Sequence, residues 1–191
     1  MATGNRGKFI EIKELLRETV ANLYSLDDFP DIPPVEEDGA TFVENAVKKA
    51  RSAALATGKP VIADDSGLEV DALGGRPGVY SARYAGEGAG DAVNNARLLD
   101  ELAEHPGGEV TAAFRCVIAF CLASGSFRTF SGELNGIILK EPRGTGGFGY
   151  DPLFLVPEYG LTLAELPLAV KNAISHRGKA LALLQEYLRT L

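Results

Sequence analysis

The sequence has 191 residues, of which 46% are hydrophobic and 24% are charged, and its formal net charge is −7. This length suits one domain with an ample core, and the negative charge argues against a nucleic-acid-binding protein. Because no apolar run reaches the roughly 18 residues of a membrane span and the N-terminus lacks a secretory pattern, we expect a cytoplasmic protein without membrane contacts.

The N-terminal third predicts two helices separated by an acidic, proline-broken loop. Apolar residues at spacings of three and four predict the first helix, namely Phe9, Ile12, Leu16 and Val20. Residues 27–39 contain three prolines and several acids, which is typical of a loop. Thr41 and Glu44 match a capping box, so a second helix is expected from there to about Thr57, with Gly58 as its stop.

The central part predicts a strand, a helix and a long hairpin. Residues 60–67 read as a short buried strand, and the glycine-rich residues 74–90 read as a loop. Asp91 is expected to cap the helix that follows. Residues 109–122 alternate in hydrophobicity, and after a turn residues 127–139 form their partner strand.

The C-terminal part predicts a glycine-rich loop at residues 142–152 and a last helix capped by Ser175. The order of elements indicates the α/β class, with a mixed β-sheet flanked by helices. Cys116 and Cys121 lie an odd number of residues apart on one expected strand. They should therefore point to opposite faces and remain thiols in a reducing compartment.

The segment Thr3 to Lys8, with sequence TGNRGK, lies at the start of the first helix. Helix N-terminal amides and a lysine in the first turn attract phosphate. A plain capping turn with a solvated lysine is the alternative interpretation.

Two adjacent carboxylates, Asp64 and Asp65, follow the apolar strand and precede Ser66. Neighbouring acids need a cation or a proton between them, and one or two carboxylates together with substrate phosphates typically hold magnesium. The alternative is an Asx turn that caps the following backbone. Glu36, with Glu37 and Asp38 beside it, is a second acidic cluster that matters only if the fold brings it to Asp65.

Two further stretches have the composition of a nucleotide-binding site. Residues 144–152, GTGGFGYDP, surround Phe148 and Tyr150 with glycines, so an aromatic ring could stack on a flat base, unless the loop is simply a surface loop. Residues 171–179, KNAISHRGK, gather cations at a helix start, where they need an anion or another acceptor, unless the stretch is simply a solvated basic turn. With two histidines in the chain, a histidine-built metal site is excluded.

Together these stretches resemble the inosine triphosphate pyrophosphatase family over nearly the whole chain. The resemblance rests on TGNRGK, on TFVENA from Thr41, on ADDSGLEVDALGGRPGVYSARYAG from Ala63, and on GTGGFGYDP and KNAISHRGKAL. It implies an elongated mixed sheet in a single domain over residues 1–191, with two lobes, a central cleft and a homodimeric assembly. It also implies Mg²⁺-dependent hydrolysis of ITP, dITP and XTP to the monophosphate and pyrophosphate.

The resemblance further implies a role for each matching residue. Asp65 matches the general base and metal ligand, and Glu36 matches the second acidic metal position, although Glu37 is an open alternative. The residues that match substrate contacts are Thr3, Gly4, Asn5, Arg6, Gly7, Lys8, Ser66, Phe148, Gly149, Tyr150, Asp151, Lys171, His176 and Arg177.

The sequence departs from the family pattern at two places. Only Met1 precedes Ala2, where family members usually carry an apolar strand, and LPLAV precedes Lys171, where acidic residues are more usual. Two other functions are compatible with the same residues: a pyrophosphatase for modified pyrimidine nucleotides with a Maf-like fold, and a nucleotide sensor without catalysis. A panel of purine and pyrimidine substrates distinguishes the pyrimidine enzyme from a purine pyrophosphatase. Measurable turnover excludes the sensor.

Overall fold

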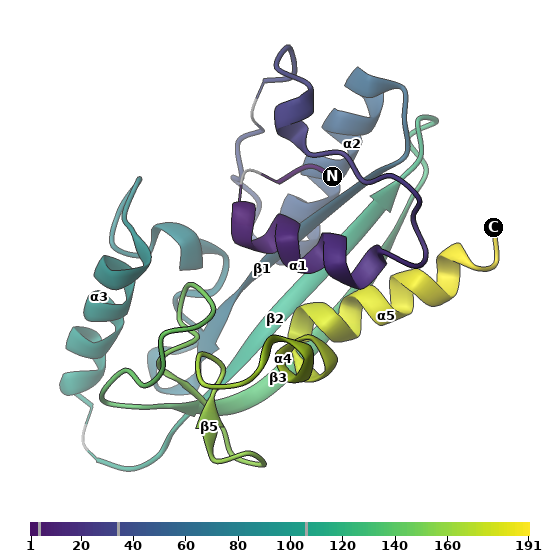
Figure 1. Ribbon diagram of the computed structural model, residues 1–191. Helices are drawn as coiled ribbons and strands as arrows, with labels where there is room; N and C mark the ends of the chain where they lie inside the picture. The colour runs from purple at the N-terminus through teal and green to yellow at the C-terminus, as the bar shows by residue number, and fades with distance from the viewer. Residues whose placement is uncertain (4, 34, 106) are drawn as a thin grey trace. The chain divides into compact units, whose positions relative to one another are not determined.

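The computed structural model describes residues 1–3, 5–33, 35–105 and 107–191 (Figure 1). In this part of the chain one sheet has the strand order β1-β2-β3-β4-β5. The strands are β1 (Val61–Val70), β2 (Val110–Cys121), β3 (Phe127–Ile138), β4 (Phe154–Val156) and β5 (Leu161–Thr162). The helices are α1 (Arg6–Leu16), α2 (Phe42–Thr57), α3 (Asp91–Ala103), α4 (Leu168–Ile174) and α5 (His176–Leu188), with short 3₁₀ helices at Leu26–Asp28, Asp71–Leu73 and Gly78–Arg83. The predicted α/β class is confirmed.

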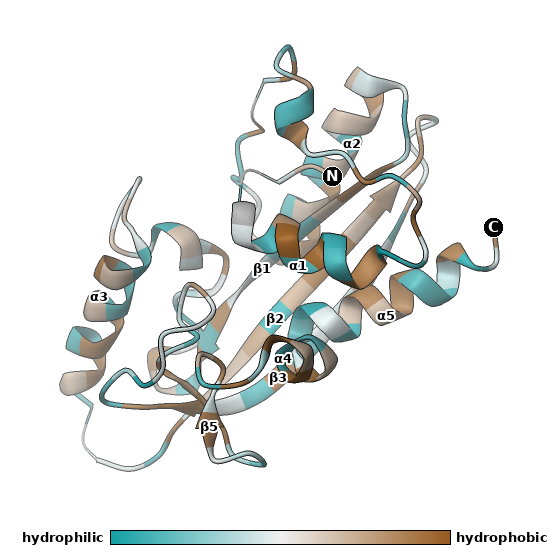
Figure 2. Ribbon diagram, viewed as in Figure 1, coloured by the Kyte–Doolittle hydropathy of each residue, from teal (hydrophilic) through white to brown (hydrophobic). Residues whose placement is uncertain are grey.

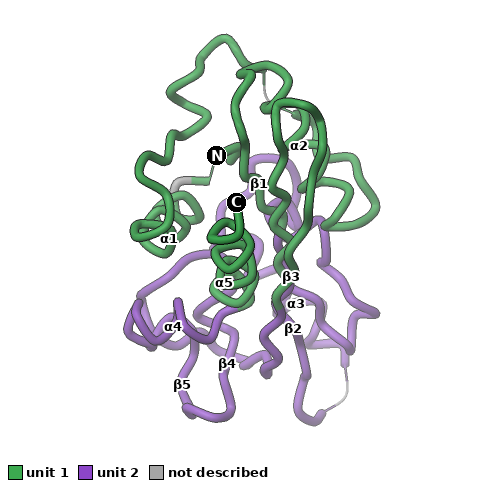
Figure 3. The backbone as a smooth tube through the Cα atoms, turned by 90° about the vertical axis from the view of Figure 1, so that its right-hand side faces the viewer, with its two compact units in different colours: residues 1–65, 116–132, 176–191 green, residues 66–115, 133–175 purple. Residues whose placement is uncertain are grey.

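The chain divides into two compact units, coloured separately in Figure 3. Unit 1 comprises residues 1–65, 116–132 and 176–191, and unit 2 comprises residues 66–115 and 133–175. Each of the strands β1, β2 and β3 has residues in both units. The expectation of one two-lobed domain over residues 1–191 stays a prediction.

The core of unit 1 is formed by α1, α5 and parts of β1 and β2. Its fully or almost fully buried members include Ile12, Leu16, Ile62, Cys116, Ile118, Leu181 and Leu184. Helix α5 packs against α1, where the Gln185 Nε2 group donates a hydrogen bond to the Leu15 carbonyl over 2.6 Å. Figure 2 shows both hydrophobic and hydrophilic residues on α1, as expected of a helix with one buried face.

The core of unit 2 contains α3 and the remaining parts of β1, β2 and β3. Leu68 and Leu98 are completely buried in it, and the Phe114 and Phe154 rings lie with their centroids 4.7 Å apart. The two described pairings in this part of the sheet, β3 with β4 and β4 with β5, are antiparallel. These strands provide the base from which the glycine-rich loop before β4 extends.

The residues of the predicted apolar face of β2 are buried from Ala112 to Phe120, but Val117, Ala119 and Cys121 on the other face are buried as well, so the strand is covered on both faces rather than on one. Ala112 and Phe114 lie in the core of unit 2, and Cys116, Ile118 and Phe120 lie in the core of unit 1. The turn to β3 is closed by a hydrogen bond from the Leu122 amide to the Ser126 carbonyl. Cys116 and Cys121 are both buried thiols, as expected.

The predicted ends of α2 are confirmed in part. Thr41 accepts a hydrogen bond from the Glu44 amide at 3.2 Å, and Gly58 ends the helix in the left-handed region with φ of 65°. The Glu44 carboxylate, however, accepts from the Ala40 amide rather than from the Thr41 amide, so the reciprocal half of the capping box is shifted by one residue.

Two expectations about the elements are wrong. The N-cap of α3 is Gly90, and Asp91 is the first helical residue, with its carboxylate bonded elsewhere. Strand β1 does not stop near Gly67 but continues to Val70, because the apolar pattern resumes at Leu68. The short elements β4, β5 and α4 lie in a stretch for which the sequence predicts no element, since two to seven residues give little periodic signal. None of the helices in the described ranges is long and apolar enough to cross a membrane.

Candidate active site

The two adjacent carboxylates lie within β1 rather than just past its end, and both are buried. Neighbouring residues on a strand point to opposite faces, so Asp64 and Asp65 have different surroundings. Each surrounding supplies cationic or amide groups, which explains how an apolar strand carries two charges in its interior. The expectation that the pair follows the strand is therefore wrong, while the expectation of cations beside it is met by the protein's own side chains.

Asp64 is enclosed by two cations of unit 1. Its Oδ2 atom lies 3.1 Å from the Lys8 Nζ and 3.5 Å from the Arg177 Nε, and its side chain is 0% exposed. Burial alone would raise the pKa of Asp64, but Lys8, Arg177 and Lys49 together hold this pKa far below its usual value. Asp64 is therefore a weak base that stays ionised at neutral pH.

Arg177 links Asp64 to a third carboxylate. Its Nη1 donates to the Glu11 Oε2 over 2.6 Å, and the residue is 2% exposed. Burial opposes its charge, but the neighbouring Asp64 and Glu11 raise the pKa of Arg177 above its usual value. The cations near the start of α5 thus have acceptors within the protein, as the helix dipole requires.

Asp65 has a more polar and less cationic environment. The Asn45 Nδ2 donates to its Oδ2 over 3.1 Å, and the Lys49 Nζ lies 3.6 Å from its Oδ1. Burial raises the pKa of Asp65, and the negative charge of Glu37 raises it further, against the opposing effect of Lys49 and Lys8. The two neighbouring carboxylates consequently have pKa values displaced in opposite directions.

The acidic loop approaches Asp65 through Glu37. The Lys49 Nζ lies 2.7 Å from the Glu37 Oε2, so one ammonium contacts both Glu37 and Asp65. Glu36, the residue assigned from the sequence, is exposed. Its role as a metal ligand stays a prediction, and the geometry makes Glu37 the acid that shares a cation with Asp65.

A divalent metal fits the chemistry of these donors. Glu37 and Asp65 are hard oxygen donors that already share a cation, and magnesium is usually held by one or two carboxylates together with substrate phosphates. Among the described residues, no cluster of three or more His, Cys, Asp or Glu side chains forms a complete protein cage. The donor set is therefore of the kind that the oxygens of a phosphorylated ligand complete.

The N-terminal segment forms a capped helix start. Thr3 accepts a hydrogen bond from the Asn5 amide, and the Asn5 side chain caps α1 by accepting from the Lys8 amide at 3.0 Å. Gly7 is half-buried in the first turn. Gly4 and the side chain of Arg6 lie outside the described residues. The two interpretations of this segment, a capping turn and a phosphate-binding helix start, are compatible. The cap occupies only the Lys8 amide, and the helix dipole at the N-terminus of α1 remains available to an anion.

In unit 2, the predicted base-binding loop contains a buried ion pair. The Lys171 Nζ lies 2.7 Å from the Asp151 Oδ2 and 4.8 Å from the centroid of the Phe148 ring. Asp151 also accepts from the Phe148 amide at 2.9 Å. Tyr150 is buried, and its hydroxyl donates to the Ser81 carbonyl at 2.9 Å. These bonds fix the Phe148 ring over a cation.

The remaining predicted residues lie at boundaries between units or elements. Ser66 is half-buried in β1 directly after Asp65, and it is the first residue of that segment of unit 2. His176 is 4% exposed and begins α5 in unit 1. The structure thus groups the N-terminal segment, Asp65 and Arg177 in unit 1, and the loop with Lys171 in unit 2.

Sequence reasoning missed Asn45, Lys49 and Glu11. Asn45 and Lys49 are four residues apart on α2, so they share the helix face that meets Asp65. That spacing is visible in the sequence, but the prediction for this helix used only its capping box and its stop at Gly58. No local signal marks Glu11, because its partner Arg177 is 166 residues away in the chain.

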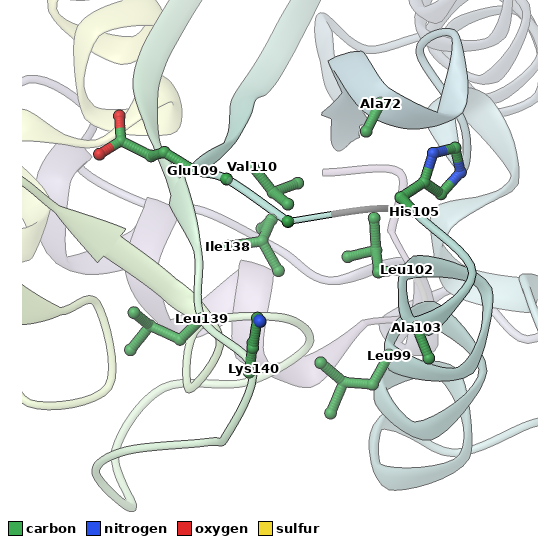
Figure 4. Close-up of a pocket in the computed structure, with 12 residues that line it drawn as sticks. Ala72, Leu99, Leu102, Ala103, His105, Glu109, Val110, Ile138, Leu139 and Lys140 are labelled. Carbon is green, nitrogen blue, oxygen red and sulfur yellow. The ribbon is translucent and has the colours of Figure 1, made fainter.

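Two pockets lie away from all of these residues. One, of about 450 Å³ in unit 2, is shown in Figure 4. Leu99 and Leu102 of α3 line it with Val110 and Ile138, and the Glu109 carboxylate points away from these apolar side chains. A second pocket of similar volume in unit 1 is lined mainly by apolar residues that include Tyr24, Phe29 and Phe120. Each is lined by one lysine, Lys140 in the first and Lys59 in the second, rather than by a cluster of cations like the one around Asp64.

Comparisons with known proteins give a consistent result. Residues 1–187 match the model of the Ham1 family. A protein of Geobacter sulfurreducens, named dITP/XTP pyrophosphatase, is 64% identical over 188 residues, which are 98% of this chain and 94% of that protein. A protein of Desulforamulus reducens with the same name is 54% identical over 100% of this chain and 95% of its own length. A solved HAM1 protein from Coxiella burnetii superposes with a TM-score of 0.91 at 44% identity, covering 100% of this chain and 97% of that one.

Proposed function

This chain belongs to the Ham1 family, and from that premise we propose that it hydrolyses non-canonical purine nucleoside triphosphates. The substrates are ITP, dITP and XTP, and the products are the nucleoside monophosphate and pyrophosphate. Relatives named dITP/XTP pyrophosphatase support this assignment at up to 64% identity over nearly the whole chain. Removing such nucleotides keeps deaminated bases out of the precursor pool.

The observation that carries the proposal is the contrast between the surroundings of the two carboxylates: Asp64 contacts Lys8 and Arg177, whereas Asp65 accepts from Asn45 and shares Lys49 with Glu37, and their pKa values are displaced in opposite directions. Two titratable groups whose environments separate their pKa values are the usual mark of divided catalytic roles. Asp64 is bound by Lys8 and Arg177 and serves as a fixed anion. Asp65 has a raised pKa, so it is the stronger base of the two and the residue to which we assign proton abstraction.

In the proposed reaction, Asp65 takes a proton from a water molecule positioned in line with the α-phosphorus. The water oxygen attacks that phosphorus, and the bond to the bridging oxygen breaks to release pyrophosphate. Lys8 and the amides at the start of α1 stabilise the charge on the departing phosphates. No covalent intermediate with the protein is required.

We propose that Asp65 binds Mg²⁺ together with Glu36 or Glu37. A bound magnesium ion supplies charge neutralisation of the phosphate oxygens. Lys49, which contacts Glu37 and Asp65, keeps these carboxylates together when no metal is bound. Asn45 orients Asp65 through its 3.1 Å hydrogen bond and so holds the other carboxylate oxygen toward its reaction partners.

We assign base recognition to residues 148–151, with Lys171, His176 and Arg177. Phe148 is expected to stack on the purine, and its ring is already held by Lys171 on one side. Hypoxanthine and xanthine present an oxygen acceptor at position 6, where adenine presents an amino donor. A site with donors at that position leaves adenine unpaired, which makes discrimination large.

The test is product analysis with Mg²⁺ on ITP, XTP, dITP, ATP, GTP and dUTP. We expect pyrophosphate and monophosphate from the first three, with little turnover of the others. Asp65→Asn should reduce kcat by about 10² to 10⁴-fold, the usual contribution of a general base. Asp31→Asn, the same change at an exposed residue of unit 1, is the matched control and should behave as the wild type.

Each other outcome identifies a specific error. Release of orthophosphate would place the attack at the γ-phosphorus. A preference for dUTP would favour the pyrimidine enzymes, and binding of ITP without turnover would favour a sensor. Full activity of Asp65→Asn would show that another group is the base.

We also propose that the protein is a cytoplasmic homodimer that acts without nucleic acid or membrane. Sedimentation velocity at micromolar concentration should give about twice the chain mass of 20.2 kDa. A single species at the monomer mass would contradict the assembly without affecting the reaction.

A further inference from the structure

We propose that Asp91 and Asn95 of α3 are positioning residues for purine recognition, acting through the Gly149 peptide of the loop at residues 147–151. The inference rests on the proposed function, because it takes that loop to contact the base. The two side chains bind Gly149, the residue after Phe148, through both its backbone carbonyl and its backbone amide.

The contacts are complementary. The Gly149 amide donates to the Asp91 Oδ2 over 2.6 Å, and the Gly149 carbonyl accepts from the Asn95 Nδ2 over 3.1 Å. Gly149 has a φ of 62°, in the left-handed region that favours glycine. Its amide and carbonyl therefore have directions that differ from those in an extended chain. A carboxylate accepts only and an amide nitrogen donates only, so each side chain fits one end of the residue.

Helix geometry explains why these two residues act together. Asp91 and Asn95 are four residues apart, so they lie one above the other on the same face of α3. Asp91 is in the first turn, where its negative charge is favoured by the helix dipole, although the helix is capped by Gly90. The carboxylate is thereby available for a charge-assisted bond to the loop.

The helix that carries them is itself fixed within unit 2. Leu98 is completely buried, and Asn94 is 3% exposed. The Asn94 Oδ1 accepts from the Ala85 amide at 2.8 Å, and its Nδ2 donates to the Ala82 carbonyl. A rigid element therefore holds the loop at its centre.

The loop is held on both sides of Gly149 as well. Before it, the Phe148 amide donates to Asp151, which is paired with Lys171. After it, Tyr150 is buried and bonded to the Ser81 carbonyl. Loss of either bond from α3 frees the Gly149 peptide to rotate, and the direction of the Phe148 ring changes with it. The expected result is poorer base binding with little change in phosphate chemistry.

The experiment compares Asp91→Ala, Asn95→Ala and Asp91→Asn in the full chain, with Asp100→Ala as a control on an exposed position of the same helix. We expect the two alanine variants at the contacts to raise KM for ITP by about 10-fold, the size of one lost hydrogen bond. Their kcat should stay within about 3-fold, and their preference for ITP over GTP should fall. Asp91→Asn retains an oxygen acceptor and should recover most of the wild-type KM.

A ligand that lacks a nucleobase distinguishes a specific effect on purine binding from a general structural effect on the site. Inorganic tripolyphosphate, measured as a competitive inhibitor, should bind all variants with unchanged Ki. An equal rise in Ki and KM, or a KM like that of the Asp100→Ala control, would overturn the inference. Thermal unfolding confirms folding. Asn95→Asp places an acceptor against the Gly149 carbonyl, so it should raise KM for ITP at least as much as Asn95→Ala, and a wild-type KM in this variant would overturn the role of Asn95. Absence of ITP turnover in the wild type would instead overturn the proposed function.

Discussion

At the scale of single residues, the charges around β1 form a chain that runs through unit 1. Glu11 contacts Arg177, Arg177 and Lys8 contact Asp64, and on the other side Lys49 contacts Asp65 and Glu37. Charges buried in this way cost desolvation energy, and the pairing offsets that cost only while all partners are present. The arrangement therefore fixes the ionisation of Asp64 and Asp65. It also makes the stability of unit 1 sensitive to the substitution of any one partner.

The pH dependence of stability should show the contribution of Asp64. Its pKa in the folded chain lies below the usual 3.8, so the folded chain binds fewer protons than the unfolded chain near that pH. The stabilisation is thus present above about pH 4 and is lost as the pH falls below it. In denaturant unfolding between about pH 5 and pH 2, the unfolding free energy of the wild type should fall more steeply than that of Asp64→Asn. Equal slopes would contradict the role of this ion pair.

The two candidate metal ligands in the acidic loop are distinguished by matched substitutions. Glu37 shares Lys49 with Asp65, whereas Glu36 is exposed. We expect Glu37→Gln to raise the Mg²⁺ concentration for half-maximal ITP hydrolysis by about 10-fold or more, and Glu36→Gln to have the smaller effect. The reverse order would return the assignment to Glu36, the residue favoured by the family pattern.

At the scale of elements, close contacts between backbones constrain the sequence as strongly as the charges do. Gly132 of β3 lies against the start of α5 in unit 1. A Cβ at this position would meet the His176 carbonyl oxygen and lie 2.7 Å from the Ala180 amide nitrogen. The absent side chain is therefore what allows α5, with His176 and Arg177, to approach the strand.

Gly132→Ala should destabilise the protein by roughly 1–3 kcal/mol, the usual cost of overpacking. The measurement is the unfolding free energy in urea. Gly90→Ala is the matched control, since a Cβ there meets no atom within 4 Å and the φ of −80° suits alanine. Its effect should stay below about 1 kcal/mol, and an equal loss in both variants would contradict the packing argument.

Periodic elements were predictable, and short or long-range features were not. The helix at residues 42–57 and strand β2 follow from apolar spacing and caps in the sequence. Elements such as β5, with two residues, depend on partners in the sheet and have no pattern of their own. The continuation of β1 past Gly67 to Val70 was missed, because a glycine after two carboxylates and a serine is typical of a strand end, although Leu68 and Val70 are both completely buried.

The site was predictable in its residue types but not in its pairings. TGNRGK, DDSG and KNAISHRGK identified the charged groups, and the family pattern assigned roles to them. The local interpretation of Asp91 as a helix cap, however, hid its bond to Gly149, which is 58 residues away. Contacts between residues so far apart in the chain are set by tertiary packing. A short stretch of sequence contains no pattern that predicts them.

At the scale of the whole molecule, the three long strands have residues in both compact units. The backbone of each of these strands therefore runs without a break from one unit into the other, so fraying of a strand in one unit disturbs its continuation in the second. We expect the chain to unfold as one cooperative system rather than as two independent units.

Two matched substitutions test this cooperativity. Leu98 in unit 2 and Leu181 in unit 1 are both 0% exposed and lie on helices. Leu98→Ala and Leu181→Ala should each cost about 2–5 kcal/mol and shift a single transition that is the same by far-UV and near-UV circular dichroism. Two separate transitions in either variant would show that the units unfold independently.

The buried cysteines of β2 have a practical consequence for handling the protein. Burial raises the pKa of Cys116 to about 12, and that of Cys121 is also raised. Since the thiolate is the reactive form, a maleimide dye should leave native molecules unlabelled and attach to both sulfurs once β2 is exposed. Mass spectrometry at successive times of the labelling reaction then gives the fraction of labelled chains, and from it the rate at which unit 1 opens. The same property should let purified stocks keep without reducing agents.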